Sequence, residues 1–532
     1  MREMDKLQSS EKVYKPCEYS TETKDHFKSN VAQFYVTFVE CLFLVLIGMQ
    51  YVLPTIVVGA LHNKLNETMA LNDDSASWIG SVLYICEPLG AVATGFMTEK
   101  VGTKGTMMFM NIPFFICWIL LYYASTVQAL FIAILMIGIG IGFCEAPVAN
   151  YIGEISDPKM RGVFTSMTTA ACNLGFMIEL FVGSILDWRT SALVSAVIPV
   201  TSFIMFLTIP ESPVWFITKG KMEEAHKSFA WIKGFLEPHA VQKEFDELVR
   251  YTKMSYDLSE NINGNSEEKV PLDGKKIQVE QVPTTWLKQR YYELSNRKLL
   301  RPLKLVFIMF IFAQCASLAP FKAYFVEILN NFHFPVESKW VLVMTGVVSF
   351  FGSCVPIFVV HLIGKRKLTL VCFTISTITV FILGIFATFF KHNENPALSW
   401  IVYITVAVNS FVGNLGVGNM PWMLLCEIFP VRQVFNKIDT SARGIASGIS
   451  AAWCYILTFV LTRTFLQTEN LIGLSGMFYL YGTISVMGTI YIYFSMPETE
   501  GKTLERIESY FTSNHDVKEK YSLRRRRNQP GV

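Results

Sequence analysis

Residues 131–155 read FIAILMIGIGIGFCEAPVANYIGEI, an apolar run that ends beside a glutamate, Glu154. A helix needs roughly 20 mostly apolar residues to cross a bilayer, and this run is longer than that. Its Gly138-x-Gly140-x-Gly142 spacing follows no strand and has no phosphate-binding lysine, so close helix packing explains it better than a nucleotide loop. The stretch therefore predicts a transmembrane helix.

Eleven further apolar runs resemble the first along the 532 residues. The twelve runs fall near 33–58, 76–98, 105–124, 127–151, 164–186, 190–210, 303–329, 339–361, 368–390, 399–425, 443–466 and 473–496. Charged residues make up only 17% of the chain and apolar residues 52%, whereas an ordinary soluble domain has roughly 25% charged residues. This composition excludes a soluble protein, and it also excludes a disordered chain. The sequence predicts an all-α membrane protein with twelve transmembrane helices.

Loop charges predict how these helices are oriented, because short cytoplasmic loops are rich in lysine and arginine. With the N-terminus inside, ten basic residues lie in short cytoplasmic loops and four lie in the opposite loops. The one N-x-Ser/Thr sequon, at Asn66, then falls in the first outer loop, where a glycan can be attached. We therefore expect both termini in the cytoplasm and a plasma-membrane location.

The chain divides into two halves around a long polar loop. We expect a cytoplasmic tail at 1–32, a six-helix bundle at 33–210, a cytoplasmic helical linker at 211–302, a second six-helix bundle at 303–496 and a cytoplasmic tail at 497–532. Three motifs recur in the same order in both halves, namely the basic turns at Gly102 and Gly364, the Glu-Ile pairs at Glu154 and Glu427, and the Pro-Glu pairs at Glu211 and Glu498. Such duplication is typical of transporters that bind substrate near the midplane and alternate access by rocking of the halves.

Charged residues of these motifs are candidates for a cytoplasmic gate. Carboxylates and basic groups at helix ends can pair while the inner mouth is closed and separate when it opens, because partly buried pairs have nearly balanced costs and gains. The candidates are Glu99, Lys100, Gly102, Lys104, Glu154, Arg161, Glu211, Glu427 and Arg443. Ordinary flanking charge explains the lysines equally well.

The motif set resembles the sugar porter family of the major facilitator superfamily. The resemblance rests on Gly95-x3-Glu99-Lys100-x-Gly102-x-Lys104, Gly153-Glu154-Ile155 with Arg161-Gly162, Pro210-Glu211-Ser212-Pro213, Pro421-Trp422 with Glu427-Ile428-Phe429-Pro430, and Pro497-Glu498-Thr499. The stretches 77–81 and 213–216 are similar to the insect facilitated trehalose transporter branch in particular. The resemblance implies a major facilitator fold of two pseudo-symmetric six-helix bundles and passage of hexoses or disaccharides.

The resemblance also implies a polar array that binds sugar hydroxyls, and this array is altered here. Trp422, the expected stacking platform for a sugar face, is kept. The other candidate substrate-binding positions fall on Thr169, Gln314, Ser349, Asn414 and Asn419. Ala313 and Ala319 stand where family members have amides. Because an unpaired buried polar group costs roughly 1–3 kcal/mol, we expect weaker glucose affinity or a different, less polar substrate.

Six ionisable residues lie within the predicted helices and belong to none of these motifs. They are Glu40, Glu87, Glu145, Glu179, Lys322 and Glu327. Intramembrane ionisable residues are functional candidates by default, and a buried carboxylate can carry a proton. Glu87 and Glu145 lie deepest and are candidates for proton coupling, with a neutral or paired structural role as the alternative. Lys322 is a candidate to pair with a carboxylate across the cavity.

Together these features predict a carrier that moves a hexose, a trehalose-like sugar or a related polyol by alternating access, as a facilitator. Two alternatives stay open: a proton-coupled symporter of the same fold, and a transport-deficient nutrient sensor in which Thr169, Ala319 and Ser349 mark a decayed site. No residue pattern predicts catalysis, a cofactor, a metal site or nucleic-acid binding. The expected partners are the small-molecule substrate and the lipid bilayer.

Overall fold

The computed structural model describes residues 19–62, 69–156, 160–250, 252, 297–325, 328, 337–389, 396–428, 441–500 and 511. Over these ranges the protein is helical, apart from turns and one isolated bridge between His62 and Leu71. Ten helical segments there are long and apolar enough to span a bilayer, and Gly448–Arg463 is a shorter apolar one. The prediction of an all-α membrane protein is confirmed.

The first bundle accounts for the first six predicted spans. Its helices are α1 (Tyr19–Leu61), α2 (Asp73–Val101), α3 (Thr103–Tyr123), α4 (Val127–Ile155), α5 (Arg161–Ile185), α6 (Trp188–Ser195) and α7 (Val197–Phe206). Side-chain caps set several of these starts, as where the Asn72 side chain accepts a 2.8 Å hydrogen bond from the Ser75 amide at the start of α2. The sixth span is divided into α6 and α7 at Ala196.

The second bundle accounts for the other six spans, with more interruptions. Its elements are α12 (Arg297–Ala316), η2 (Ala319–Tyr324), α14 (Ser338–Cys354), α15 (Pro356–Ile363), α16 (Lys365–Phe389), α17 (Pro396–Val412), η3 (Gly413–Val417), α18 (Asn419–Ile428), α19 (Ser441–Arg463) and α20 (Phe465–Ser495). The prediction of one continuous helix over 303–329 is wrong. Leu318 has a left-handed φ of 51°, and the chain then continues as the 3₁₀ helix η2, which contains Pro320 in its first turn.

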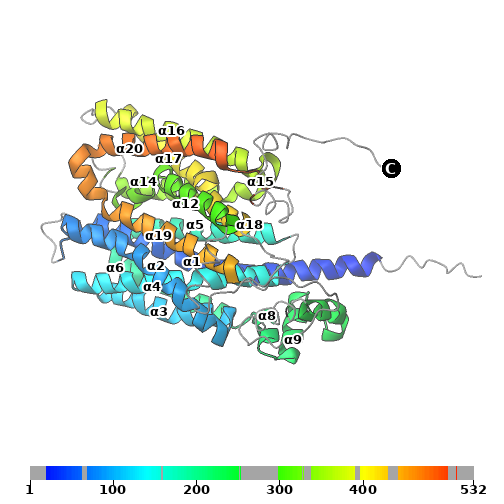
Figure 1. The fold of residues 1–532 in the computed structure, drawn as a ribbon. Coiled ribbons are helices and arrows are strands. Elements are labelled where there is room, and N and C mark those ends of the chain that lie inside the picture. The colour runs from blue at the N-terminus through cyan, green and yellow to red at the C-terminus, as the bar shows by residue number, and fades with distance from the viewer. Residues whose placement is uncertain are drawn as a thin grey trace, which may run out of the picture.

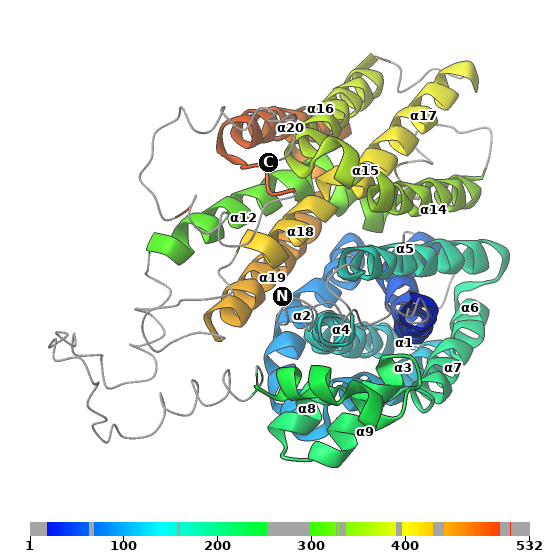
Figure 2. The same cartoon turned by 90° about the vertical axis from the view of Figure 1, so that its right-hand side faces the viewer.

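The two bundles lie side by side, with their helices running roughly along a common axis (Figure 1). Three short elements of the connecting segment, α8 (Pro213–Thr218), α9 (Met222–Ile232) and η1 (Pro238–Val241), project beyond one end of the first bundle. We call this end the linker end and the opposite end the far end. Viewed onto the linker end, α5 faces α14 and α2 lies beside α19 across the interface (Figure 2).

Glycines on α4 allow close packing of the first bundle, as their spacing predicted. A Cβ atom added at Gly142 would collide with the backbone carbonyl of Glu87 on α2, and one at Gly138 would collide with that of Leu83. The two backbones therefore meet directly, which holds Glu87 at a fixed position against α4.

Candidate functional site

The Glu211 carboxylate caps the start of α3 at the linker end. It accepts hydrogen bonds from the backbone amides of Lys104 and Gly105, both at 2.9 Å, and from the Thr103 hydroxyl at 3.0 Å. The chain reaches this position through Gly102, whose φ of 94° suits glycine. A carboxylate at a helix N-terminus satisfies free N–H groups and complements the helix dipole. This contact joins the linker to the first bundle.

The second half repeats this arrangement with Glu498. Its carboxylate accepts hydrogen bonds from the amides of Lys365 at 3.0 Å and Arg366 at 3.2 Å, at the start of α16. Gly364 precedes them with a φ of 87°, and a Cβ atom there would lie 2.7 Å from the Glu498 carboxylate. The sequence duplication is therefore also a duplication of geometry.

Further contacts tie the linker to the first bundle around the same point. The Ser212 hydroxyl donates to the Glu154 carboxylate. The Lys104 ammonium donates to the Ile209 carbonyl at 2.7 Å, and the Tyr151 hydroxyl donates to the Pro210 carbonyl at 2.5 Å. Glu154 and Glu211, predicted as members of an inter-helix gate, thus make these contacts within the first half.

The structure places the remaining predicted gate residues less completely. Glu99 and Lys100 have exposed side chains, and the Glu99 carbonyl accepts a 3.1 Å hydrogen bond from the Trp215 indole. The side chains of Arg161, Glu427 and Arg443 lie outside the described residues, as do Asn66 and Glu327. A gate formed by these charges stays a prediction.

Side chains from both bundles meet deep in the interface between α4 and α19. The Tyr455 hydroxyl on α19 donates a hydrogen bond to the Glu145 carboxylate on α4. The Tyr455 ring lies 6.0 Å from the Trp422 ring, which packs edge-on against Phe310 at 5.2 Å. Gln314 donates to the Cys454 sulfur at 3.2 Å, one residue before Tyr455. Two predicted substrate residues, Gln314 and Trp422, therefore lie together, next to a carboxylate of the opposite bundle.

Two other predicted substrate residues donate side-chain hydrogen bonds to backbone carbonyls nearby in the chain. The Asn414 amide donates to the Ser410 carbonyl at 2.9 Å, and the Asn419 amide donates to the Asn414 carbonyl. Asn414 lies in the π-helical turn η3, and Asn419 begins the helix that follows it. The helix register changes at this turn, so a side-chain amide can take the place of a missing backbone donor.

Thr169 and Ser349 complete the set of predicted substrate residues. The Thr169 carbonyl accepts a 3.1 Å hydrogen bond from the Asn173 amide, and the Thr169 side chain is half-buried. Ser349 is buried on α14. No contact in the described part of the chain joins either residue to the Trp422 group.

Glu87 lies in the same region of α2 and is fully buried. Among the described residues, neither of its carboxylate oxygens makes a hydrogen bond of ordinary length and angle, and the Tyr51 hydroxyl is the donor that lies beside it. Tyr51 and Tyr84 are its aromatic neighbours, and their rings stack at a centroid distance of 6.4 Å. Glu87 also interacts electrostatically with Glu145 and with Tyr455 of the second bundle. The two deepest predicted carboxylates therefore belong to one site.

The other intramembrane charges have different surroundings. Lys322 lies with its ammonium 5.7 Å from the Phe176 ring, and its carbonyl accepts a 3.0 Å hydrogen bond from Thr55. Its predicted carboxylate partner is not found among the described residues. Glu179 accepts hydrogen bonds from Ser191 at 2.8 Å and Ser195 at 2.6 Å, which indicates a structural role.

A group of side chains that sequence reasoning missed connects the bundles at the far end. Arg463 on α19 donates to the Asp74 carboxylate at 2.5 Å and to the Ser77 hydroxyl at 3.0 Å. Its guanidinium lies 4.8 Å from the centre of the Trp78 ring. We call these four residues the far-end clamp. A basic residue ending an apolar span was the available signal, but it carries no information about its partner.

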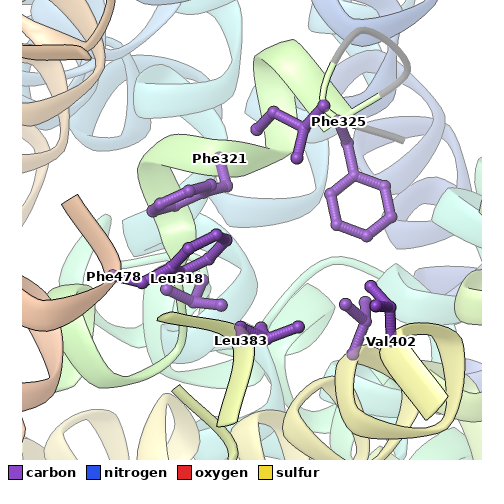
Figure 3. Close-up of a pocket in the computed structure, with 8 residues that line it drawn as sticks. Leu318, Phe321, Phe325, Leu383, Val402 and Phe478 are labelled. Atoms are coloured by element: carbon purple, nitrogen blue, oxygen red, sulfur yellow. The ribbon is translucent and has the colours of Figure 1, made fainter. Parts of the chain in front are cut away.

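A small pocket in the second bundle has a different character. Leu318, Phe321, Phe325, Ile328, Leu383, Val402, Val406 and Phe478 line it, between η2, α16, α17 and α20 (Figure 3). All eight residues are apolar, so the pocket offers no hydrogen-bonding side chain to a sugar.

Comparison with known proteins places the chain in context. A family model described as "Sugar (and other) transporter" matches residues 31–511. The facilitated trehalose transporter Tret1 of Polypedilum vanderplanki is 25% identical over 460 residues, which cover 86% of this chain and 83% of that protein. Tret1 of Bombyx mori is 25% identical over 516 residues, covering 95% and 93%.

Solved structures agree on the architecture. The proton:xylose symporter XylE bound to 6-bromo-6-deoxy-D-glucose superposes with a TM-score of 0.67 at 19% identity, covering 91% of this chain and 100% of that one. The inward-open conformation of XylE from E. coli gives 0.66 at 18% identity, covering 90% and 99%. The fold is therefore that of the major facilitator superfamily.

Proposed function

Because this chain belongs to the sugar transporter family and is a membrane sugar carrier, we propose that it moves a hexose, a disaccharide or a related polyol by facilitated diffusion. The observation that supports this best is the group formed by Gln314, Trp422 and Tyr455 against Glu145. Stacking platforms and hydrogen-bonding groups meet there at the interface of the bundles, where carriers of this architecture bind substrate.

The chemistry of this group suits a polyhydroxylated solute. The Trp422 ring offers an apolar face to the C–H face of a sugar ring. Glu145 offers a charged acceptor, and hydrogen bonds to charged groups are the stronger ones. Amide and phenol groups of Gln314 and Tyr455 add further donors. Because Tyr455 and Glu145 belong to different bundles, their bond has to break whenever the bundles part at this depth.

Alternating access then follows from contacts at two levels. The far-end clamp holds α2 and α19 together while the far end is closed. At the linker end, the carboxylates of Glu211 and Glu498 keep the linker and the turns at Gly102 and Gly364 attached to their own bundles. Each bundle can therefore move as one body, with the charges of Arg161, Glu427 and Arg443 proposed as the gate between them.

We place the linker end in the cytoplasm of a plasma-membrane protein, with both termini on that side. The excess of basic residues in the loops at this end supports the orientation. Glycosylation of Asn66, at the opposite face, is part of the same proposal.

Glu87 supports a second candidate mode, proton-coupled symport. A fully buried carboxylate with only the Tyr51 hydroxyl beside it as a donor is costly when ionised, so it is suited to bind and release a proton. A pH gradient across proteoliposomes distinguishes the modes. Facilitated diffusion predicts equal uptake with and without the gradient, whereas symport predicts gradient-driven accumulation that is lost in Glu87→Gln.

A substrate panel tests the proposed function. Purified carrier in proteoliposomes is offered radiolabelled glucose, trehalose and a polyol, alongside the Trp422→Ala variant. The account expects saturable uptake of at least one of them and its loss in Trp422→Ala. Absence of uptake of every sugar and polyol, from protein that remains folded and monodisperse, would instead indicate a sensor.

A further inference from the structure

Glu87 and Glu145 are two carboxyl groups with free acceptor capacity at the bundle interface. Glu87 has 0% exposure, and within the described part of the protein the Tyr51 hydroxyl is the donor beside it, with no hydrogen bond of ordinary length and angle to either oxygen. Glu145 is half-buried and receives the Tyr455 hydroxyl on one oxygen. The described residues offer no partner for its other oxygen. Buried carboxylates rarely lack a counter-charge unless a ligand or a proton supplies it.

Aromatic side chains surround the pair on both bundles. Tyr51 and Tyr84 accompany Glu87 on the first bundle, while Tyr455 and Trp422 approach Glu145 from the second. Glu87 lies within electrostatic range of Tyr51, Tyr84 and Tyr455, and its side chain has no exposed surface. Faces of tyrosine and tryptophan rings attract cations. Carboxylates and ring faces together make an environment suited to a positive charge.

Lys322 is a basic side chain of the same region, and among the described residues it makes no ion pair with Glu87 or Glu145. Its ammonium lies 5.7 Å from the centre of the Phe176 ring, and Cys172 is within electrostatic range of both Lys322 and Glu87. Within the described part of the chain, neither acid therefore has a paired cation. A ligand with a positive charge would supply one.

Several side chains of this region that could bind neutral sugar hydroxyls are already engaged in other hydrogen bonds or replaced by alanine. Asn414 and Asn419 donate to carbonyls of their own helix, and Gln314 donates to the Cys454 sulfur. Alanines stand at 313 and 319. These three amides therefore each have a donor already engaged within the second bundle, whereas the two carboxyl groups retain free acceptor capacity.

From these observations we infer that the carrier prefers a sugar or polyol bearing a protonated amine. The ammonium lies between Glu87 and Glu145, and the sugar ring lies against Trp422. The inference rests on the proposed function, because it names the substrate class of that same site. It assigns to the two glutamates a specificity-determining role, in which the substrate nitrogen takes the place that a proton would take in a symporter.

Binding by the purified full-length carrier tests this assignment. Isothermal titration at slightly acidic pH compares D-glucosamine with N-acetyl-D-glucosamine and D-glucose, which share the ring but lack the charge. We expect glucosamine to bind at least about tenfold more tightly than either, which corresponds to the lower end of the contribution of one hydrogen bond to a charged group. In Glu145→Gln, the ratio of glucosamine affinity to glucose affinity should fall to about one, whatever the variant does to the binding of both sugars.

Glu40→Gln is the matched control, because Glu40 is also a fully buried, unpartnered carboxylate of the first bundle but neighbours Tyr151 towards the linker end. It should leave the glucosamine preference unchanged. Equal binding of charged and neutral sugars by the wild type, or a preference that survives in Glu145→Gln, would overturn the inference and leave the sugar carrier intact. A pH gradient that drives glucose uptake through Glu87, without amine preference, would overturn it in favour of a proton. No binding or uptake of any sugar would instead overturn the proposed function.

Discussion

Tyr455 on α19 donates its hydroxyl proton to a hydrogen bond with Glu145 on α4, and so joins the two bundles deep within the membrane-spanning region. Trp422 and Gln314 lie around this bond on the side of the second bundle. The contact therefore couples the proposed substrate-binding region to the relative position of the bundles. A carrier that alternates access needs such a coupling, because substrate and conformation have to influence each other.

Tyr455→Phe removes the donor but keeps the ring against Trp422. A hydrogen bond to a charged group contributes about 1.5–3 kcal/mol, so the conformation with joined bundles should lose at least about tenfold in population. Labelling of the buried Cys454 by a thiol reagent, followed by peptide mapping, should accelerate accordingly. Tyr481→Phe, which changes a buried tyrosine within the second bundle, is the control. Unchanged Cys454 labelling in Tyr455→Phe would show that the bond does not hold the bundles.

The far-end clamp should bias the carrier towards closure of the far end. The Asp74 side chain is largely exposed, so the ion pair contributes at the low end of about 0.2–1 kcal/mol, and the contact of Arg463 with Trp78 adds about 0.5–1 kcal/mol. Arg463→Ala should therefore make a Ser81→Cys probe, buried one turn below Ser77, a few-fold more reactive with an impermeant maleimide.

Charge reversal separates the ion pair from the ring contact in this clamp. Asp74→Arg alone should open the far end, and Asp74→Arg with Arg463→Asp should restore part of the closure. A double variant as open as the single one would mean that the pair is incidental and that packing of Trp78 holds the far end.

The duplicated caps should have matching effects on stability. Glu211→Gln and Glu498→Gln each keep an acceptor oxygen but lose the charge at the start of α3 or α16. Charge at a helix N-terminus contributes about 0.3–1 kcal/mol, and up to about 2 kcal/mol when partly buried. We expect both variants to lower the thermal midpoint of detergent-solubilised protein by similar amounts. If only one of the two variants lowered the thermal midpoint, the two caps would share a geometry but would not contribute equally to stability.

Two glycines of α4 offer a paired test of the close packing against α2. Gly142→Ala places a methyl group on the Glu87 carbonyl, whereas Gly153→Ala meets nothing within 4 Å. The first should cost about 1–3 kcal/mol or more, and the second should be neutral or slightly stabilising. Yields of folded protein and thermal midpoints measure both. Equal stability of the two variants would contradict the direct backbone contact.

Asp187, outside the membrane spans, gives a pH-dependent contribution. It caps α6, and hydrogen bonds, first that from the Thr190 hydroxyl, hold its pKa below the usual value. The stabilisation is therefore complete above the unfolded pKa of about 3.9 and is lost as the pH falls through the lower folded pKa. Asp187→Ala should lower the free energy of unfolding at neutral pH by about 0.5–2 kcal/mol, the usual cost of losing an N-cap side chain. The thermal midpoint should fall with it. The difference from wild type should shrink in acid; a constant difference would contradict the capping role.

The sequence predicted the fold well because membrane spans depend on long apolar runs, which are read directly from composition. Within the described residues, helix occupies part or all of every predicted run, although the run at 303–329 is broken at Leu318. The breaks at Ala196 and Leu318 were missed, since they depend on packing and on local backbone geometry. Pro320 was visible as a breaker, but nothing in its neighbours specified a left-handed residue two positions earlier.

The candidate site was less predictable. Residue types indicated Trp422, Gln314 and Glu145, and the structure brings these together. Tyr455 and Arg463 were missed because their importance lies in partners 310 and 389 residues away in the chain. Substrate binding by Asn414 and Asn419 stays a prediction; the π-helical turn, in which the Asn414 carbonyl accepts from the Asn419 amide, is a feature that the sequence did not reveal.

Counterflow tests the central claim, a sugar carrier that works by alternating access, most directly. Proteoliposomes loaded with a high concentration of unlabelled sugar are diluted into a trace of the labelled sugar, with no pH gradient or membrane potential. The account predicts a transient overshoot of labelled sugar inside the vesicles, reduced in Trp422→Ala, because a returning carrier exposes its site to label outside. Simple equilibration without overshoot, or no entry of any sugar tested, would contradict it.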